Sequence, residues 1–317
     1  MRKIRNYNIL IIGDLMLDQY IKGKHLRQSP EADIPIILKA SEENRLGGAG
    51  NVAINIKSLT ANPILVSVTG NDAQSYKLKS ILDKHQIKHQ LIIDDSRPTT
   101  TKCRVINESY DQFIRIDHES ESVISKAIQG EVIKAISGIL SKNSIDALII
   151  QDYNKGLITS ELIEFIQKQA LLKNIPVFTD PKNANFRILS DCKVFKPNLK
   201  EFKSYLELDK VNIDDLAKLV NHSDLLSKNF IITLAEEGVF YSNSHSSGII
   251  KGVNIENPDV SGAGDTVISV ITILYLLKYP LKSIALIANE CGAFVCQKRG
   301  ISSIPLLDFE KIINNQT

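Results

Sequence analysis

The sequence predicts an α/β fold in which helices cover both faces of a mostly parallel central sheet. Short apolar runs, typical of buried parallel strands, alternate along the chain with segments whose apolar residues recur at helical spacing. The chain has 317 residues, of which 43% are hydrophobic. This is enough for one large domain with a buried core over residues 1–317.

The predicted elements alternate in chain order. The apolar runs predicted as strands are residues 8–14, 64–68, 147–150, 177–179 and 230–234. Residues 51–59 and 160–173, between these runs, have the helical pattern. The inner-face residues predicted for these two helices are Val52, Ile56, Leu59, Leu162, Ile163, Ile166 and Leu171. A third apolar helix, over residues 266–277, is too short to span a membrane, so no membrane partner is expected.

Two regions interrupt this alternation. Residues 19–40 and 99–117 contain short segments in which apolar and polar residues alternate, as in antiparallel strands. We expect them to form a small β-sheet that stands off the main domain. Such a sheet can act as a lid or as a dimer surface, and we expect a homodimer through this lid.

Polar residues close several of the predicted strands. Asp14, Asp152 and Asp180 each follow an apolar run, and a loop follows Leu234. Ligands of parallel sheets bind beyond the carboxyl ends of the strands, so these positions are candidates for a binding site.

A glycine-rich segment, Asp-Val-Ser-Gly-Ala-Gly-Asp at residues 259–265, leads into the third helix. Its small residues leave free backbone N–H groups at a helix N-terminus, which favours anions and above all phosphate. Asp265 places a carboxylate beside this cradle, suited to accept a proton from an attacking hydroxyl. The segment predicts phosphoryl transfer to an alcohol. The alternative is an ordinary glycine turn with a helix-capping aspartate.

A second glycine cluster, Gly-Gly-Ala-Gly-Asn-Val-Ala at residues 47–53, has three interpretations. With Asp72 it matches the dinucleotide fingerprint of nicotinamide enzymes, which requires a strand directly before the first glycine. Residues 39–46 are mostly polar and predict no such strand, which disfavours this interpretation. The cluster is otherwise a sugar site with Asn51 as a hydrogen-bonding arm, or a glycine pair that packs a helix.

The segment Lys-Pro-Asn-Leu-Lys-Glu at residues 196–201 places Asn198 and Glu201 on one face of a starting helix. In isolation this pattern indicates a capping box, in which the two residues satisfy each other's backbone N–H groups. Beside a phosphate site the same pair could hold Mg²⁺ through water, because Mg²⁺ keeps several of its waters in proteins.

Basic residues gather at the predicted site. Two lysines follow predicted strands and two more basic residues lie on the predicted lid, which suggests a substrate with its own anionic group. These four residues are Lys102, Arg104, Lys155 and Lys182.

The net charge of +2, from 38 basic and 36 acidic residues, gives no support to nucleic acid as a partner. The four cysteines have no metal-ligand spacing and are expected to be reduced thiols, which fits the cytoplasm.

In their order and spacing these motifs resemble the ribokinase-like, or pfkB, family of carbohydrate kinases, over residues 13 to about 303. Residues 47–53 match its first signature, residues 198–201 its N-x-x-E element, and residues 259–265 its second signature. The resemblance implies a ribokinase-like fold and a kinase that uses ATP and Mg²⁺.

The resemblance also implies roles for single residues. Asp265 would be the catalytic base, beside the γ-phosphate held by the N–H groups of Gly262, Ala263 and Gly264. The nucleotide and its metal are assigned to Asn198, Leu199, Lys200, Glu201 and, at the adenine, Asn289. The substrate residues are Asp14, Gly48, Asn51, Lys102, Arg104, Asp152, Lys155 and Lys182.

Within this family the chain resembles most the kinases of D-glycero-β-D-manno-heptose 7-phosphate. The matching stretches are residues 13–20, 29–32, 152–156, 180–182 and 196–201. This implies a stand-alone cytoplasmic kinase that phosphorylates the anomeric hydroxyl to the 1,7-bisphosphate, toward the ADP-heptose of lipopolysaccharide cores. Two positions depart from the family pattern, with Ser261 in place of a common Thr and Gly50 in place of a more usual Ala.

Other functions stay open. A kinase of the same family could act on ribose, fructose 6-phosphate or adenosine. A nicotinamide oxidoreductase is disfavoured by the missing strand before the first glycine cluster. A non-catalytic sugar-phosphate sensor is disfavoured by Asp265, because a sensor needs no base.

Overall fold

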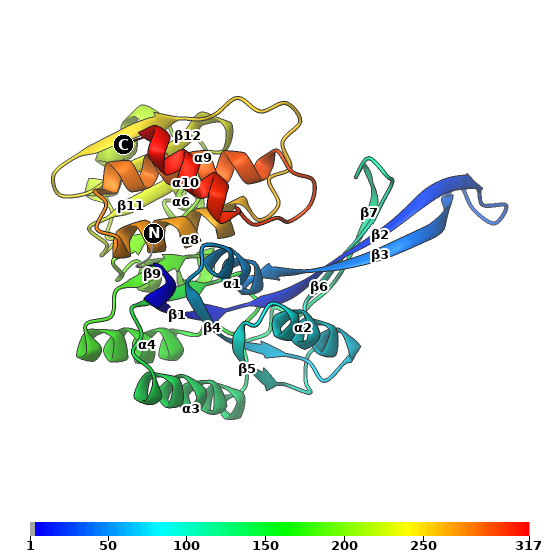
Figure 1. Cartoon of the computed structure of the whole chain (residues 1–317), viewed down its shortest axis with the longest axis horizontal. Coiled ribbons are helices and arrows are strands. Elements are labelled where there is room, and N and C mark those ends of the chain that lie inside the picture. Colours follow the sequence, from blue (N-terminus) through cyan, green and yellow to red (C-terminus); the bar gives the residue numbers. More distant parts are fainter. Residues whose placement is uncertain (1–3, 317) are drawn as a thin grey trace.

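A computed structural model describes residues 4–316, so residues 1–3 and 317 of the predicted 1–317 domain lie outside the described residues. A nine-stranded sheet forms the centre, with helices on both faces, and a four-stranded sheet projects from it (Figure 1). The strand order of the large sheet is β13-β12-β11-β10-β9-β8-β1-β4-β5. Every pairing from β5 to β11 is parallel, and β12 and β13 add antiparallel pairs. The predicted α/β class is confirmed.

The bounds of these elements agree closely with the predicted runs. The strands of the large sheet are β1 (Asn8–Gly13), β4 (Asn62–Thr69), β5 (Lys88–Ile93), β8 (Ala147–Gln151), β9 (Val177–Asp180), β10 (Val194–Phe195), β11 (Phe230–Thr233), β12 (Gly238–Ser242) and β13 (Ser247–Lys251). The helices are α1 (Ala49–Ser58), α2 (Ala73–Lys84), α3 (Lys126–Lys142), α4 (Ser160–Lys173), α5 (Phe186–Leu189), α6 (Leu199–Tyr205), α7 (Leu216–His222), α8 (Ala263–Leu276), α9 (Leu281–Cys296) and α10 (Leu306–Gln316).

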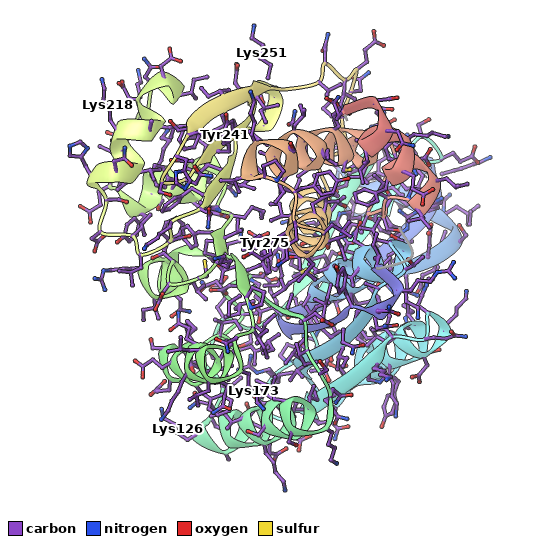
Figure 2. All side chains as sticks on the ribbon, turned by 60° about the vertical axis from the view of Figure 1, so that its left-hand side comes forward. Lys126, Lys173, Lys218, Tyr241, Lys251 and Tyr275 are labelled. Carbon is purple, nitrogen blue, oxygen red and sulfur yellow. The ribbon has the colours of Figure 1, made fainter. Side chains whose placement is uncertain are left out.

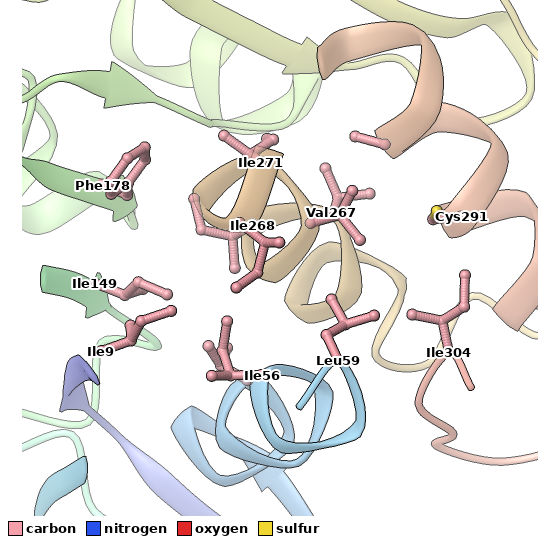
Figure 3. Packing of buried hydrophobic residues seen from close by; sticks show 14 of the residues in the cluster. Ile9, Ile56, Leu59, Ile149, Phe178, Val267, Ile268, Ile271, Cys291 and Ile304 are labelled. Carbon is pink, nitrogen blue, oxygen red and sulfur yellow. The ribbon is translucent and has the colours of Figure 1, made fainter. Parts of the chain in front are cut away.

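Both faces of the parallel sheet are buried, which explains why its strands read as continuous apolar runs. In β1, Ile9 and Ile11 belong to one hydrophobic cluster, while Leu10 and Ile12 belong to the other. Helices α1, α8, α9 and α10 cover the first cluster, and α3 and α4 cover the second. Figure 3 shows the first cluster, where side chains of α1, α8 and α9 meet beside β1, β8 and β9.

One inner-face prediction is wrong. Leu171 of α4 is 80% exposed, whereas Ala170 is buried. Leu171 follows the buried Ile166 by five residues, which is about 140° around the helix, so the two cannot share a face. Figure 2 labels Lys173, the last residue of α4, and Lys126, the first residue of α3.

The small sheet has the strand order β3-β2-β6-β7 and projects from the body of the molecule (Figure 1). Its strands are β2 (Leu15–Gln28), β3 (Pro35–Gly48), β6 (Thr101–Ile106) and β7 (Gln112–His118). The predicted segments 19–40 and 99–117 fall on these strands, but β2 and β3 reach closer to the core at both ends. The β2–β6 pair is parallel, where antiparallel strands were expected.

The long strand β3 contradicts the expectation that no strand precedes the first glycine cluster. It runs into Gly48, directly before α1, so a strand does precede the first glycine cluster. Residues 39–46 look like a loop because this sheet stands away from the core, and its strands need no apolar side chain at alternate positions. The preceding strand belongs to the small sheet and pairs antiparallel with β2, unlike the parallel strand of a dinucleotide-binding unit.

Candidate active site

The predicted strand-end residues lie side by side at one edge of the large sheet. The backbone N–H of Asp14, after β1, donates to the carbonyl oxygen of Gln151 on β8 at 3.1 Å. The N–H of Asp152 donates to the carbonyl oxygen of Asp180 on β9, also at 3.1 Å. The carboxyl ends of β1, β8 and β9 thus bring three buried aspartates together.

The glycine-rich segment forms the N-terminus of α8 next to this edge. Helix α8 begins at Ala263, and Gly262 at its N-cap has φ +79° and makes no side-chain capping bond. A Cβ at Gly262 would press on the amide of Asn51 at 2.5 Å. A Cβ at Gly264 would lie 3.5 Å from the Lys196 ammonium. The glycines thus leave the first turn of α8 without side chains at Gly262 and Gly264, as a backbone anion site requires.

Asp265 lies in this first turn and is 1% exposed. Its carboxylate accepts hydrogen bonds from Asn51 Nδ2 at 2.8 Å, the Tyr153 hydroxyl at 2.8 Å and Gln151 Nε2 at 3.2 Å. Burial raises the pKa of Asp265 to about 7, against the lowering effect of the Asn51 and Tyr153 hydrogen bonds. A carboxylate with a pKa near neutrality is well matched to general-base work.

Three residues of this site were missed as site residues from the sequence: Gln151, Tyr153 and Lys196. Lys196 is 2% exposed and its ammonium lies 2.9 Å from Asp180 Oδ2, under the start of α8. Tyr153 and Lys196 fall inside motifs that were recognised, but only the folded chain shows that they point at this carboxylate and this helix. Gln151 ends an apolar strand and carries no signal of its own.

Asp14 is held by the loop that follows β8. Its Oδ2 accepts the backbone N–H groups of Tyr153 at 2.8 Å and Lys155 at 3.2 Å. Burial, and then the nearby Asp152, raise the pKa of Asp14 to about 7. Gly48 has φ +56°, and a Cβ there would overlap the carbonyl oxygen of Asp14. The first glycine cluster thus lets α1 begin directly against Asp14.

The capping box at the start of α6 is confirmed. Asn198 Oδ1 accepts the N–H of Glu201 at 2.8 Å, and Glu201 Oε2 accepts the N–H of Asn198 at 2.8 Å. The other oxygen of Glu201 pairs with Lys182. Leu199 and Lys200 form the first turn of this helix.

The donor set at α6 fits Mg²⁺ only in one way. Both carboxylate oxygens of Glu201 already have partners, so a metal would be held through water and would take the place of Lys182. Within residues 4–316, no cluster of three His, Cys, Asp or Glu residues could hold a metal ion directly. Few direct ligands are typical of Mg²⁺ that is bound together with phosphates.

Each of the four basic residues expected to bind an anion already has a carboxylate partner. Arg104 pairs with Asp18, and Lys182 with Glu201. Lys102 and Lys155 share one partner, Glu119, although they come from the lid and from the core. Lys102 and Lys155 therefore converge, whereas Lys182, which follows β9, pairs with Glu201 at the start of α6.

Residues 6–307 match the pfkB family of carbohydrate kinases. The chain belongs to this family. The enzyme class expected from the sequence, an ATP-dependent sugar kinase, agrees with this membership. No helix in the described part of the kinase is both long and apolar enough to cross a membrane.

Curated relatives of this pfkB kinase are named bifunctional protein HldE. That of Koribacter versatilis is 33% identical over 94% of this chain and 61% of its own length. That of Helicobacter pylori is 33% identical over 98% of this chain and 66% of its own length. The kinase thus spans less than two thirds of these relatives.

Solved structures share the fold at low identity. Phosphofructokinase-2 from Escherichia coli, in complex with potassium, has a TM-score of 0.79 at 16% identity, covering 98% of this chain and 99% of that one. A carbohydrate kinase from Agrobacterium tumefaciens has a TM-score of 0.72 at 16% identity, covering 97% of both chains. These likenesses support the ribokinase-like fold.

The position expected at the adenine lies beside a cavity. Asn289 of α9 donates from Nδ2 to the carbonyl oxygen of Lys251 at 2.9 Å. Lys251 ends β13 and, with Glu236, Gly252 and neighbouring residues, lines a cavity of about 460 Å³ (Lys251 is labelled in Figure 2).

Proposed function

We propose that this kinase transfers the γ-phosphoryl group of MgATP to the anomeric hydroxyl of D-glycero-β-D-manno-heptose 7-phosphate. The product would be the 1,7-bisphosphate, toward the ADP-heptose of lipopolysaccharide cores. One observation carries the reaction type: a buried carboxylate, Asp265, in the first turn of a helix whose glycine-rich N-terminus has no side-chain cap. The likeness to proteins named HldE supports the sugar.

Asp265 is the proposed base. An anomeric hydroxyl is more acidic than an ordinary alcohol, so a carboxylate with a pKa of about 7 can take its proton as the oxygen attacks phosphorus. The N–H groups of Gly262, Ala263 and Gly264 would stabilise negative charge on the transferring group. Lys196, whose ammonium lies beside Gly264, adds a positive charge to the same place.

The nucleotide and its metal also have proposed binding residues. Mg²⁺ supplies charge neutralisation on the phosphates, and Asn198 and Glu201 would hold it through water. Asn289 and the cavity next to Lys251 would receive the adenine.

The sugar would lie over the edge of the large sheet, under the small sheet. Its proposed binding residues are Asp14, Gly48, Asn51 and Asp152, with Lys102, Arg104, Lys155 and Lys182 for its phosphate. Asn51 also orients the base, because its amide donates to Asp265.

We also propose a homodimer through the small sheet. In its strand register, one face carries Asp18, Lys102 and Asp117, whereas the other carries apolar side chains such as Ile114 and Ile116. Ile114 and Ile116 are 54% and 56% exposed, and a second copy of the sheet would cover them.

A cytoplasmic location is proposed from the use of ATP and from four free cysteines.

An ADP-release assay with MgATP tests the reaction and the sugar together. It compares heptose 7-phosphate, ribose, fructose 6-phosphate and adenosine, for the wild type, Asp265→Asn and the surface control Asp224→Asn. We expect turnover on the heptose phosphate alone, lowered roughly 10²–10⁴-fold in Asp265→Asn and unchanged in the control. Turnover on another compound alone would discard the heptose, and a fully active Asp265→Asn would remove the base.

A further inference from the structure

Glu119 joins the small sheet to the core through two lysines. It lies in the segment between β7 and α3, and its Oε1 is 2.8 Å from the Lys155 ammonium on the loop after β8. Its Oε2 is 3.5 Å from the Lys102 ammonium on β6. A carboxylate from a third segment thus bridges one cation of the lid and one cation of the core.

Glu119 holds Lys102 less closely than it holds Lys155. Glu119 Oε2 is buried and makes no hydrogen bond among the described residues, so its contact with Lys102 is a loose ion pair. Lys102 has its other carboxylate, that of Asp117, at the same distance of 3.5 Å. Lys155 is closely paired, with Glu121 as a second partner at 3.1 Å. The Lys102 ammonium therefore has weaker contacts than its partly buried position calls for.

The two lysines border the proposed sugar site. The backbone N–H of Lys155 donates to the carboxylate of Asp14. Lys102 stands opposite Asp18 in the β2–β6 register, on the same face of the small sheet. The side chains of Lys102 and Lys155 are 20% and 10% exposed, so a charge placed between them is only partly screened by water.

We propose that Lys102 and Lys155 form the seat for a phosphate monoester carried by the substrate, and that Glu119 occupies this seat when the sugar is absent. This inference rests on the proposed function, because it takes the acceptor to be a phosphorylated sugar. A phosphate monoester carries up to two negative charges and three terminal oxygens, so it can replace Glu119 and bond closely to both ammonium groups. Sugar hydroxyls are neutral and leave the bridge in place. The two lysines therefore select phosphorylated sugars, and Glu119 competes with the substrate phosphate for them.

The first test is Glu119→Gln, which keeps the shape and removes the charge. The substrate phosphate no longer competes with a carboxylate, so KM for a phosphorylated sugar should fall roughly three- to fivefold with kcat unchanged. The heptose with and without its phosphate makes the comparison, and KM for the unphosphorylated sugar should not change. An equal change for both sugars, or a rise for the phosphorylated one, would overturn the inference.

The matched control is Glu42→Gln. Glu42 also bridges two lysines, Lys39 at 2.7 Å and Lys77 at 3.0 Å, on β3 and α2 and outside the proposed seat. Its loss should leave KM for every sugar unchanged. A decrease equal to that of Glu119→Gln would mean that any lost carboxylate on the lid attracts anions, and would remove the special role of Glu119.

A binding measurement separates this inference from the choice of sugar. With the nucleotide site filled by Mg–AMP-PNP, inorganic phosphate is titrated calorimetrically into the wild type, Glu119→Gln and Lys155→Met. Phosphate should bind several-fold more tightly to Glu119→Gln and more weakly to Lys155→Met. If the heptose phosphate is not turned over while this order holds, the proposed sugar fails and the seat remains. Equal binding to all three proteins would show that phosphate does not bind between Lys102 and Lys155.

Discussion

At the scale of single residues, the environment of Asp265 suits the base that we propose. Its burial raises its pKa, while hydrogen bonds from Asn51 and Tyr153 lower it, and the balance lies at about 7. The carboxyl group is thus only partly ionised at neutral pH, and its ionised form is basic enough to take a proton. One loop serves two carboxylates, because Tyr153 donates its hydroxyl to Asp265 and its backbone N–H to Asp14.

The pH dependence of kcat/KM follows from this balance. A base must be ionised to act, so kcat/KM should fall as the pH falls through about 7. Tyr153→Phe removes a donor that stabilises the ionised form, which raises the pKa of Asp265. The acid limb of the profile, where kcat/KM falls with falling pH, should therefore move to higher pH. The profile is measured across about pH 5 to 9.

Tyr205→Phe is the control for this profile. The Tyr205 hydroxyl also donates to a carboxylate, that of Asp224, but this pair lies on the surface. The control should keep the wild-type limb. A limb that stays in place in Tyr153→Phe would show that this hydroxyl does not set the pKa of the base.

At the scale of elements, the start of α8 combines a helix N-terminus with missing side chains. A Cβ at Gly264 would make only ordinary van der Waals contacts in the free protein, at 3.5 Å from Lys196 Nζ and 3.7 Å from Asp180 Oδ2. The glycine is therefore not needed for packing. It leaves room for the phosphoryl group that we place between α8 and Lys196.

Gly264→Ala should separate stability from activity. The free energy of unfolding should stay equal or rise by up to about 0.5 kcal/mol, because Ala favours a helix more than Gly. Activity should fall roughly 10²-fold or more, because a methyl group enters the phosphate cradle. Urea unfolding and the ADP-release assay measure the two effects.

Gly138→Ala in α3 provides the comparison. No heavy atom lies within 4 Å of a Cβ at this position, so this substitution should stabilise the protein and leave its activity intact. If Gly264→Ala were as active as Gly138→Ala, the cradle would not hold the transferring group.

At the scale of the whole molecule, the small sheet is a platform with two different faces. One face carries the charged network around Asp18 and Lys102 and covers the proposed sugar site. The opposite face exposes apolar side chains, including Ile114 and Ile116, in a sheet that extends from the body (Figure 1). Exposed apolar patches often mark interaction sites, and we propose that a second copy covers this one.

Ile116→Lys should therefore convert a dimer into a monomer, because a second sheet cannot cover an ammonium group without desolvating it. Light scattering after gel filtration measures the mass. The control Leu171→Lys replaces a leucine that is 80% exposed on α4, and should stay dimeric. A wild-type monomer, or a dimer that persists in Ile116→Lys, would place the interface elsewhere or remove it.

The sequence by itself determined the features that depend on neighbouring residues. Apolar runs fixed the buried strands, glycines at residues 259–265 marked the start of α8, and Asn198 with Glu201 formed the predicted capping box. These features are local, since strand periodicity, helix starts and caps involve residues a few positions apart.

Only the tertiary structure decided which side chains meet. Asn51 and Tyr153 reach Asp265 across 214 and 112 residues of sequence, so no motif records these contacts. The pairing of Lys102 and Lys155 through Glu119, and the extension of β3 to Gly48, depend likewise on the sheet edge and on the distance of the lid from the core. Burial and charge partners set the pKa of a group, and both come from the fold.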